Sequence, residues 1–418
     1  MKVSELFTKT RKEAPAGEPS KNAQLLMRAG FVHKQMAGVY AYLPLGKKVI
    51  ENITKIVREE MNAIGGQEVQ LTALQPKELW EITDRWDDKK VDIWFKTQLK
   101  AGGELALAMS HEEPLTDLLT NYITSYTDLP LLAYQIGTKF RNELRAKSGL
   151  LRGREFTMKD MYSFARDETE HQKLFNEVKN AYIKIFERIG LGDRTFFTTA
   201  SGGVFSSEYS YEFQTVTASG EDIIYLDRDK KIAINEEVYS DKVIHELGLN
   251  KTKLEKVKAS EVGNIFNLGS KYSKPLSLSF LSEANTKEQV VMGCYGLGIS
   301  RVMGVIAEDL SDEKGLVWPK AIAPAQVYLI RLDDDTKVIK QADELYEHLT
   351  RKGIEVLYDD RNVRPGEKFA DADLIGLPYR VIVSKKTISD NKVELKARKS
   401  DSATLLTEAE VVETLIKK

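Results

Sequence analysis

Short stretches of strand-forming residues surround one long helical stretch in the middle of the chain, and this arrangement constrains the fold more than any other feature. Strands are expected at 131–140, 155–164, 211–217, 222–226 and 290–295. The helix is expected to begin after Asp167, with Glu170 three residues later as a capping partner, and to end at Gly190. Because the helices are set apart from the strands, the pattern indicates an α+β fold around an antiparallel sheet.

Helix and strand signals also precede this sheet. Apolar residues recur at helical spacing over 47–64, and Gly65-Gly66 is expected to end that helix. Residues 68–74 then alternate as a strand, which Pro76 stops. Residues 10–22 are polar and contain Pro and Gly, so we expect an extended arm there.

The character of the chain changes after Pro319, where strands and helices alternate. The expected strands are 326–332, 354–358, 379–384 and 392–397, and the expected helices are 335–352, 366–375 and 408–417. This alternation indicates a separate α/β domain. We therefore divide the chain into residues 1–320 and 321–418.

Composition places the chain among ordinary globular proteins. Of the 418 residues, 42% are hydrophobic and 30% charged, and the formal net charge is −2, so any nucleic-acid binding must depend on local patches. The single Cys294 excludes an intrachain disulfide and fits a reducing compartment. Because the N-terminus has no apolar signal region and no apolar run could span a bilayer, we predict a cytoplasmic protein without membrane contact.

A strand, a basic turn at Ser148-Gly149 and a second strand form an expected hairpin over 138–160. Seven cations face only three anions in this hairpin: Lys139, Arg141, Arg145, Lys147, Arg152, Arg154 and Lys159 against Glu143, Glu155 and Asp160. Such an excess suits a polyphosphate, since a guanidinium group can hold two phosphoryl oxygens at once. The Phe156 ring could stack on a purine. An exposed basic hairpin without a ligand is the alternative.

Two other motifs fail the tests of the sites they superficially match. The glycines at 293, 296 and 298 do not make a dinucleotide fingerprint, because Arg301 stands where the third glycine is required. Ser110-His111-Glu112-Glu113 is not the start of a zinc motif, because Leu115 occupies the position of the second histidine. We therefore predict no metal-ligating residues.

Taken in order, these motifs resemble those of a known enzyme family. Motif 2 of class II aminoacyl-tRNA synthetases resembles this hairpin, in which Phe140-Arg141-x-Glu143 is followed by a loop and Arg152-x-Arg154-Glu155-Phe156. The sequence of the hairpin is close to that of bacterial prolyl-tRNA synthetases. The segments 110–113, 293–301 and 359–361 follow in the family's order, and the resemblance covers roughly residues 4–418. The helix and strand over 47–74 resemble motif 1, the family's dimer interface, although Thr72 stands where relatives usually carry proline.

The resemblance implies a homodimeric class II enzyme that ligates L-proline to tRNA(Pro) through prolyl-adenylate, with ATP as substrate and Mg²⁺. It implies an antiparallel catalytic domain followed by an α/β anticodon-binding domain. The implied catalytic residues are Arg141 at the α-phosphate and Arg301 at the γ-phosphate. The implied ATP-binding residues are Arg141, Glu143, Arg152, Phe156, Gln214 and Arg301. The implied proline-binding residues are Ser110, Glu112, Arg141, Tyr211, Cys294 and Gly296. The candidate tRNA-binding residues are Arg145, Lys147, Asp359, Arg361, Arg364, Lys368 and Phe369.

Three departures from the family pattern stand out. Ser110 replaces the usual threonine, and Tyr211 replaces a histidine. Only the short segment 237–260 lies where many bacterial relatives insert an editing domain, and we interpret it as a linker too short to fold independently. Two alternatives remain open: a synthetase for another amino acid, such as threonine, and a non-catalytic synthetase-like protein.

Overall fold

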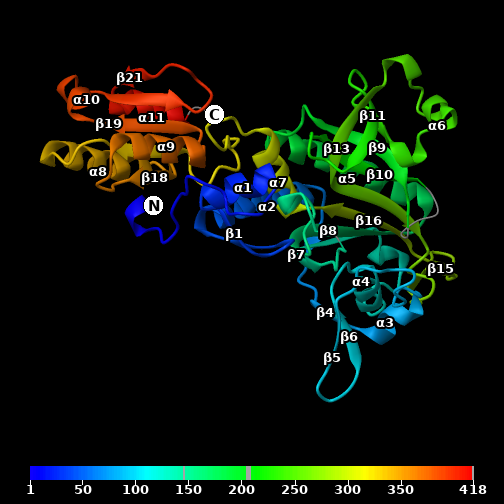
Figure 1. Cartoon of the computed structure of the whole chain (residues 1–418). Helices are drawn as coiled ribbons and strands as arrows, with labels where there is room; N and C mark the ends of the chain where they lie inside the picture. The colour runs from blue at the N-terminus through cyan, green and yellow to red at the C-terminus, as the bar shows by residue number, and fades with distance from the viewer. Residues whose placement is uncertain (145, 204–208, 417–418) are drawn as a thin grey trace. The chain divides into compact units, whose positions relative to one another are not determined.

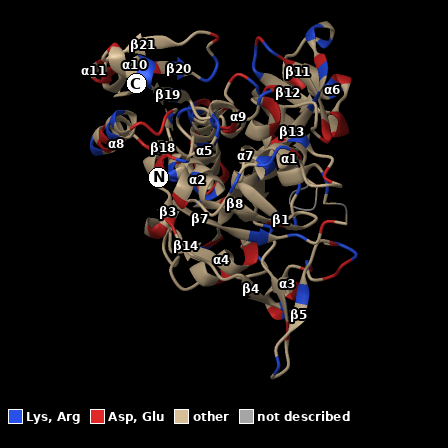
Figure 2. Cartoon of the chain, turned by 60° about the vertical axis from the view of Figure 1, so that its left-hand side comes forward, with Lys and Arg blue, Asp and Glu red and all other residues tan. Residues whose placement is uncertain are grey.

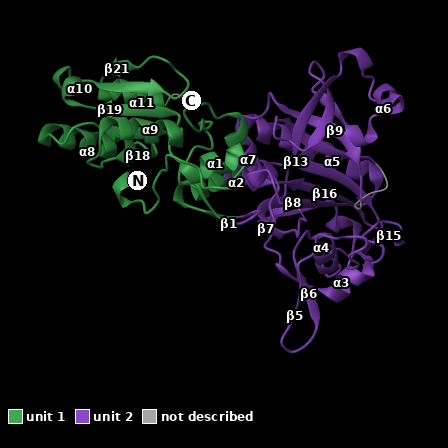
Figure 3. Ribbon diagram, in the orientation of Figure 1, with its two compact units in different colours: residues 1–35, 40–53, 306–418 green, residues 36–39, 54–305 purple. Residues whose placement is uncertain are grey.

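The computed structural model describes residues 1–144, 146–203 and 209–416. Contacts divide the chain into two compact units (Figures 1 and 3). One unit contains residues 1–35, 40–53 and 306–418, and the other contains residues 36–39 and 54–305. The compact units therefore do not coincide with the division at residue 320, which rests on the change of sequence pattern after Pro319. Lys and Arg are interleaved with Asp and Glu along both units (Figure 2).

The helices and strands have the following bounds in the described residues. The helices are α1 (Lys21–Arg28), α2 (Pro44–Ala63), α3 (Lys77–Ile82), α4 (Glu112–Leu119), α5 (Glu168–Arg188), α6 (Asp241–Glu246), α7 (Ile299–Asp309), α8 (Thr336–Arg351), α9 (Pro365–Ile375), α10 (Lys385–Ser389) and α11 (Glu408–Ile416). The strands are β1 (Val32–Met36), β2 (Val39–Tyr42), β3 (Gln67–Glu68), β4 (Leu74–Pro76), β5 (Lys96–Gln98), β6 (Glu104–Leu107), β7 (Leu131–Phe140), β8 (Glu155–Ala165), β9 (Thr195–Ser201), β10 (Tyr209–Val216), β11 (Asp222–Asp227), β12 (Ile232–Asn235), β13 (Glu255–Gly269), β14 (Ser279–Leu281), β15 (Lys287–Gln289), β16 (Val291–Leu297), β17 (Val327–Arg331), β18 (Val356–Asp359), β19 (Tyr379–Val383), β20 (Val393–Ala397) and β21 (Thr404–Leu406). Short 3₁₀ helices lie at Val3–Glu5, Tyr126–Asp128, Gly149–Leu151, Glu236–Val238 and Lys251–Lys253.

A large, mainly antiparallel sheet forms the centre of the second unit, and it confirms the expected α+β class. Its strand order in the described residues is β10-β9-β12-β11-β13-β16-β8-β7-β3, and β10 also pairs with β13. Only the β12–β9 and β3–β7 pairs among these are parallel. The long strand β13 pairs in turn with β11, β10 and β16, and so connects the two halves of the sheet.

Helix α5 covers one face of this sheet, as its sequence pattern predicts. The Asp167 side chain accepts a hydrogen bond from the Glu170 N–H at 2.8 Å and caps the helix. Its apolar stripe is buried, and Tyr182 lies beneath Gly263, where an added Cβ would come within 3.1 Å of the ring. The opposite face of the sheet therefore remains for a ligand site.

The strand expected at 68–74 is wrong in extent. The Val69 N–H still donates to the Tyr134 carbonyl at 2.8 Å, but the Leu71 N–H donates instead to the Gln135 side chain at 3.1 Å. Because a side chain replaces the neighbouring strand's carbonyl, the ladder stops after β3 and pairing resumes with β6 at β4.

The segment 237–260 is more ordered than the expected linker. It contains α6, a 3₁₀ turn and the first residues of β13. Val243, Ile244 and Leu249 are buried against Ile234 of β12, so the segment has a small apolar cluster of its own. Its ends remain in the sheet, because Asn235 and Glu255 both pair with β11.

The C-terminal part of the first unit is the expected α/β domain. Its sheet has the order β18-β17-β19-β20-β21, parallel over the first three strands and antiparallel beyond them. The sequence did not indicate α10 or β21. A capping box at Ser384 and Thr387 starts α10.

The first ten residues of the chain contact this same domain. Lys2 forms a parallel bridge with Tyr358, and the Ser4 hydroxyl donates to Asp360 at 2.6 Å. The Thr10 hydroxyl donates to Asp371 at 2.5 Å. These contacts explain why residues 1–35 group with the C-terminal part of the chain.

Candidate active site

Strand register decides which side chains share the face that α5 leaves open. Directly paired residues of an antiparallel sheet place their side chains on the same face. Cys294 pairs with Tyr162 and Phe266, and Gly296 pairs with Asp160 and Asn264. The face opposite α5 therefore carries Cys294 and Gly296, two residues apart on β16.

A polar hollow lies on this face around the end of β16 and the start of α7. It is lined by Arg141, Glu143, Leu150, Leu151, Arg152, Gly153, Phe156, Met158, Glu261, Val262, Gly263, Asn264, Gly296, Gly298 and Arg301. The hollow thus brings together residues of two distant segments, the hairpin at 138–160 and the glycine-rich segment at 293–301. A Cβ at position 296 would lie 2.4 Å from Met158 Cε and 2.6 Å from Asn264 Oδ1, so a larger residue there would displace these side-chain ends.

The Arg141 guanidinium projects into the hollow with few contacts of its own. Its Nη2 lies 3.9 Å from Met158 Sδ, and its centre lies 5.3 Å from the Phe156 ring. Nε has no hydrogen-bond partner among the described residues. Burial, followed by the charge of Arg301, lowers the pKa of Arg141 from its ordinary value. A half-buried guanidinium with an unused donor is suited to bind an anion.

Arg301 is held at the other side of the hollow in the first turn of α7. Its Nη1 donates to the Glu261 carbonyl and lies 3.6 Å from a Glu261 carboxylate oxygen. The Ser300 hydroxyl accepts the Thr157 N–H at 2.8 Å, which ties α7 to β8. Arg301 is thereby fixed on α7, and it lines the same hollow as Arg141, which follows the end of β7.

Glu143 and Arg152 are already paired with each other. Arg152 Nε donates to Glu143 Oε2 at 2.9 Å, and Arg152 Nη1 donates to Glu221 at 2.8 Å. Phe156 is half-buried beneath Arg141. The implied adenine contacts are therefore brought together, with Arg152 between two carboxylates.

Three carboxyl groups meet beside Arg301, and the sequence indicated none of them. Gln214 Nε2 donates to Glu212 at 2.9 Å and to Asp222 at 2.7 Å. Burial, with Glu261 and then Asp222 nearby, raises the pKa of Glu212 to about 8. Burial also raises the pKa of Asp222. Gln214 is thus buried against two of these carboxyl groups and is not among the residues that line the hollow.

Besides the hollow, the face of the sheet opposite α5 carries a cluster of Ser110, Glu112 and Cys294. Glu112 Oε1 accepts the Ser110 hydroxyl at 2.7 Å and the Cys294 thiol at 3.3 Å. Burial would raise the pKa of Glu112, but Arg85 and the Ser110 hydroxyl outweigh it and lower the pKa. The cluster therefore presents one ionised carboxylate.

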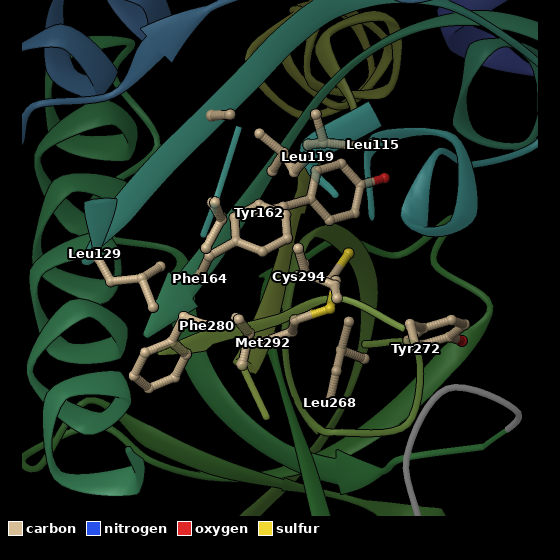
Figure 4. Close-up of a cluster of buried hydrophobic side chains, with 14 of the residues drawn as sticks. Leu115, Leu119, Leu129, Tyr162, Phe164, Leu268, Tyr272, Phe280, Met292 and Cys294 are labelled. Atoms are coloured by element: carbon tan, nitrogen blue, oxygen red, sulfur yellow. The ribbon is translucent and has the colours of Figure 1, made fainter. Parts of the chain in front are cut away.

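Cys294 behaves as part of the wall of this cluster. Figure 4 shows its side chain beside Met292 in an apolar cluster that includes Tyr162 and Leu268. Burial, followed by the Glu112 charge, raises the pKa of the thiol well above its ordinary value. A neutral thiol that donates a hydrogen bond does not serve as a nucleophile.

A buried network fixes the backbone that leads into α4. Asp160 accepts from Lys139 Nζ at 2.7 Å and from the Tyr162 hydroxyl at 3.1 Å. The Tyr162 oxygen in turn accepts the His111 N–H at 3.0 Å. Burial would raise the pKa of Asp160, but Lys139 and His111 hold it well below its ordinary value. Sequence reasoning missed these positioning residues, because burial of Lys139 depends on strand register.

The structure does not bring Tyr211 together with Ser110, Glu112 and Cys294. Tyr211 pairs with Ile265 of β13, whereas Glu212 pairs with Asn264 on the Gly296 face. Its ring stacks on Phe197 at 5.0 Å and meets Phe175 of α5 edge-on at 5.5 Å. Because side chains alternate along a strand, Tyr211 lies on the helix-covered face.

The candidate tRNA contacts fall into two groups. Lys147 is exposed, 3.7 Å from Glu221, and Arg145 lies outside the described residues. In the C-terminal domain, Arg364 is exposed, and Phe369 is half-buried with the Arg380 guanidinium 4.8 Å from its ring.

Asp359, Arg361 and Lys368 are engaged inside the C-terminal domain. Arg361 donates to Asp359 at 2.7 Å and to Asp371 at 2.7 Å. Asp359 is fully buried, and Lys368 Nζ donates to the Arg331 carbonyl at 2.6 Å. In this structure the three side chains brace the loop after β18.

No group of three or more metal-ligating side chains is found in the described ranges. Within the same ranges, no helix has both the length and the apolar character needed to cross a membrane.

The family models place this geometry in context. The tRNA synthetase class II core domain (G, H, P, S and T) matches residues 94–310, and an anticodon binding domain matches residues 326–418. The first match contains both clusters, and the second contains the β17–β21 sheet.

Curated relatives and solved structures agree with these models. The chain is 38% identical over 417 residues to a proline--tRNA ligase of Rickettsia rickettsii, covering 96% of each chain. It is 38% identical over 409 residues to the proline--tRNA ligase of Wolbachia pipientis, covering 95% of each. The prolyl-tRNA synthetase of Cryptosporidium parvum, solved with L-proline and AMP, superposes with a TM-score of 0.75 at 20% identity, over 95% of this chain and 74% of that one. The enzyme of Giardia lamblia, in complex with prolyl-adenylate, gives a TM-score of 0.77 at 19% identity, over 93% and 74%.

The two structural neighbours establish the fold, and the curated relatives establish the family over nearly the whole length. This chain belongs to the proline--tRNA ligase family of class II aminoacyl-tRNA synthetases.

Proposed function

We propose that this chain ligates L-proline to tRNA(Pro) in two steps, through prolyl-adenylate. The observation that carries the proposal is the shared face of β16. Cys294 touches the Glu112 carboxylate, and Gly296 lines the hollow between Arg141 and Arg301. Two residues along a strand span about 7 Å, so an amino acid at Glu112 and a nucleotide in the hollow would meet.

The first step needs positioning more than proton transfer. A carboxylate oxygen of proline attacks the α-phosphorus of ATP, the new oxygen–phosphorus bond forms, and the bond to the leaving pyrophosphate breaks. The nucleophile is already an anion, so no general base is required. Arg141 would neutralise the charge that develops at the α-phosphate, and Arg301 would hold the γ-phosphate.

Adenine would be held by Glu143 and Phe156, with Arg152 on the phosphates. Because Arg152 bridges Glu143 and Glu221 here, binding would exchange one of these ion pairs for a phosphate. Gln214 would contact the nucleotide from β10.

Proline would bind with its ammonium against Glu112 and the Ser110 oxygen, while Cys294 and Gly296 shape the wall. Arg141 lies close enough to Glu112 to feel its charge, and so could also hold the carboxylate of proline. We leave Tyr211 out of this pocket, because its ring packs on Phe175 and Phe197.

The residues present fit Mg²⁺ that arrives with ATP. Mg²⁺ is commonly held by one or two carboxylates together with substrate phosphates. Asp222 and Glu261 line the wall beside Arg301, so one or both could hold Mg²⁺ together with the phosphates. Bound Mg²⁺ would supply charge neutralisation at the phosphates.

In the second step the terminal ribose hydroxyl of the tRNA attacks the carbonyl carbon of the adenylate, and AMP leaves. Lys147 and Arg145 could guide the acceptor end, and Arg364 and Phe369 could contact anticodon bases by hydrogen bonding and stacking. We assign catalysis to residues 1–320 and anticodon reading to residues 321–418. Family membership supports a homodimer acting in the cytoplasm.

Amino-acid-dependent pyrophosphate exchange, screened over all twenty amino acids, tests this function. We expect exchange with proline far above all others. Pyrophosphate exchange with threonine instead of proline would show that the chain is a synthetase for threonine. Binding of ATP and tRNA without any exchange would show a non-catalytic synthetase-like protein.

A further inference from the structure

Arg85 is a buried arginine outside the motifs that the sequence singled out. It lies just after α3 and is 4% exposed. Its Nη1 donates to Glu112 Oε2 at 3.1 Å and to both carboxylate oxygens of Glu113 at 3.0 Å. One guanidinium nitrogen is thus shared between two neighbouring carboxylates.

Aromatic rings hold this guanidinium in place. Its centre lies 4.9 Å from the Trp80 ring and 5.3 Å from the Tyr272 ring. The Arg85 carbonyl accepts the Trp94 indole N–H at 3.0 Å, so the backbone is fixed as well. A planar, weakly hydrated cation between rings keeps one orientation, which a flexible ammonium would not.

The two carboxylates differ in what else they contact. Glu113 Oε1 accepts the Thr83 hydroxyl at 2.6 Å. Glu112 Oε1 accepts Ser110 and Cys294, on the side that faces β16. Arg85 therefore approaches Glu112 from the side opposite the proposed proline pocket and fixes the direction of its carboxylate.

Arg85, Glu112 and Glu113 together carry one excess negative charge when both carboxylates are ionised. Glu112 and Glu113 are fully buried and share Arg85. Burial and the Glu112 charge outweigh Arg85 at Glu113 and raise its pKa to about 7, whereas the pKa of Glu112 is lowered. The other charged groups near this cluster are Lys271, which is exposed, Arg141, which feels the charge of Glu112, and the Asp160–Lys139 pair beyond Tyr162. Of the two carboxylates Glu112 ionises first, and once Glu113 is ionised as well, a ligand cation at Glu112 would balance the excess negative charge.

We propose that Arg85 is a positioning residue for proline recognition: it orients the Glu112 carboxylate and keeps it ionised to meet the secondary ammonium of the substrate. This inference rests on the proposed function, because it takes Glu112 as the partner of the amine. Arg85 acts through Glu112 and does not touch the substrate.

Four variants separate this role from a general structural one. Arg85→Met removes the charge and keeps an apolar stem. Because a buried carboxylate left without its partner can destabilise the fold, Arg85→Met/Glu113→Gln removes one anion together with the cation. Arg85→Lys retains charge without the planar fork. Glu113→Gln alone is the background for the double variant.

Two further variants complete the set. Glu112→Gln is the reference for loss of the amine contact. Arg398→Met is the matched control, since Arg398 is a buried arginine paired with Asp312 at 2.7 Å in the other compact unit.

The measurement is the KM of proline and of ATP in pyrophosphate exchange, with thermal unfolding of each variant. Tetrahydrofuran-2-carboxylate, which replaces the ring nitrogen of proline by oxygen, serves as a competitive inhibitor without the ammonium. We expect Arg85→Met and the double variant to raise the KM of proline about ten- to a hundredfold, the value of a hydrogen bond to a charged group. The KM of ATP and the inhibition constant of the oxygen analogue should change less than about threefold. Arg85→Lys should recover part of the loss.

Three results would overturn the inference. The first is a folded double variant that retains the KM of proline seen with Glu113→Gln. The second is an equal loss of affinity for proline and for the oxygen analogue, which would indicate that Arg85 only shapes the pocket. The third is a comparable change in Arg398→Met. An unchanged KM of proline in Glu112→Gln would instead overturn the role of Glu112 in the proposed function itself.

Discussion

Replacing Arg141 by alanine should separate catalysis from stability more cleanly than any other substitution in the hollow. The guanidinium makes only a 3.9 Å contact with Met158 Sδ and a 5.3 Å approach to the Phe156 ring, and Nε is unpartnered among the described residues. Its removal leaves no buried carboxylate without a partner and relieves repulsion from Arg301. We therefore expect the free energy of unfolding to change by less than about 1 kcal/mol.

Catalysis should respond very differently. A preorganised charge at a developing oxyanion contributes about 3–4 kcal/mol, which corresponds to a roughly hundred- to thousandfold slower adenylation step. Proline-dependent pyrophosphate exchange measures that step, and denaturant unfolding measures stability. Arg188→Ala is the control, because Arg188 bridges Glu59 and Glu60 on the surface and should leave exchange unchanged.

Either of two results would refute this reasoning. Exchange by Arg141→Ala within a few-fold of the unmodified chain would show that Arg141 is not at the reacting phosphate. A loss of several kcal/mol in unfolding free energy would show that the guanidinium is structural.

Four further outcomes follow from the structure. Tyr211→Ala should lower the unfolding free energy by about 2 kcal/mol through lost ring packing, with the KM of proline unchanged, and a selective rise in that KM would contradict the register. The pKa of Glu212 is raised from 4.5 to about 8 in the folded state, so the folded protein holds a proton that the unfolded chain releases. The free energy of unfolding of the unliganded protein should therefore fall by about 2 kcal/mol between pH 6 and pH 8, and Glu212→Gln should remove this fall. Arg364→Ala should raise the KM of tRNA(Pro) and leave pyrophosphate exchange intact; an equal effect on both assays would exclude an anticodon role. Alanine lacks two ring carbons of proline, and each gives only about 1–3 kcal/mol of discrimination, so we expect detectable alanine activation. With no editing domain between β12 and β13, we expect no enzyme-dependent release of alanine from alanyl-tRNA(Pro).

The features that the sequence predicted are those with local causes. Helix α5 follows from its apolar spacing and the Asp167 cap, both of which lie within the segment itself. The strands around Arg141 and Arg301 were predicted within a few residues, whereas a shared site for the two arginines was implied by the family resemblance.

The features that the sequence did not reveal depend on contacts distant along the chain. The face on which Tyr211 lies follows from its register opposite Ile265, which alternation alone does not set. Arg85 lies in a charged stretch typical of a surface, and its burial depends on Tyr272 and on Glu113. A signal was nevertheless present, since Trp80, Trp86 and Trp94 mark an apolar setting around it.

The self-packed segment between β12 and β13 gives this enzyme a position for engineered insertions. Its two ends are anchored nearly opposite one another on β11, with Ile224 facing Asn235 and Leu226 facing Glu255. Gly248 forms an exposed turn between them with a φ of +61°. A labelled or ligand-responsive module inserted at Gly248 would lie in a loop whose ends, Asn235 and Glu255, are already held by the sheet. The entropic cost of closing that loop would therefore rise only slowly with the length of the insertion. Movement of such a module would report on the strands that carry Glu212 and Glu261, from outside the reacting centre.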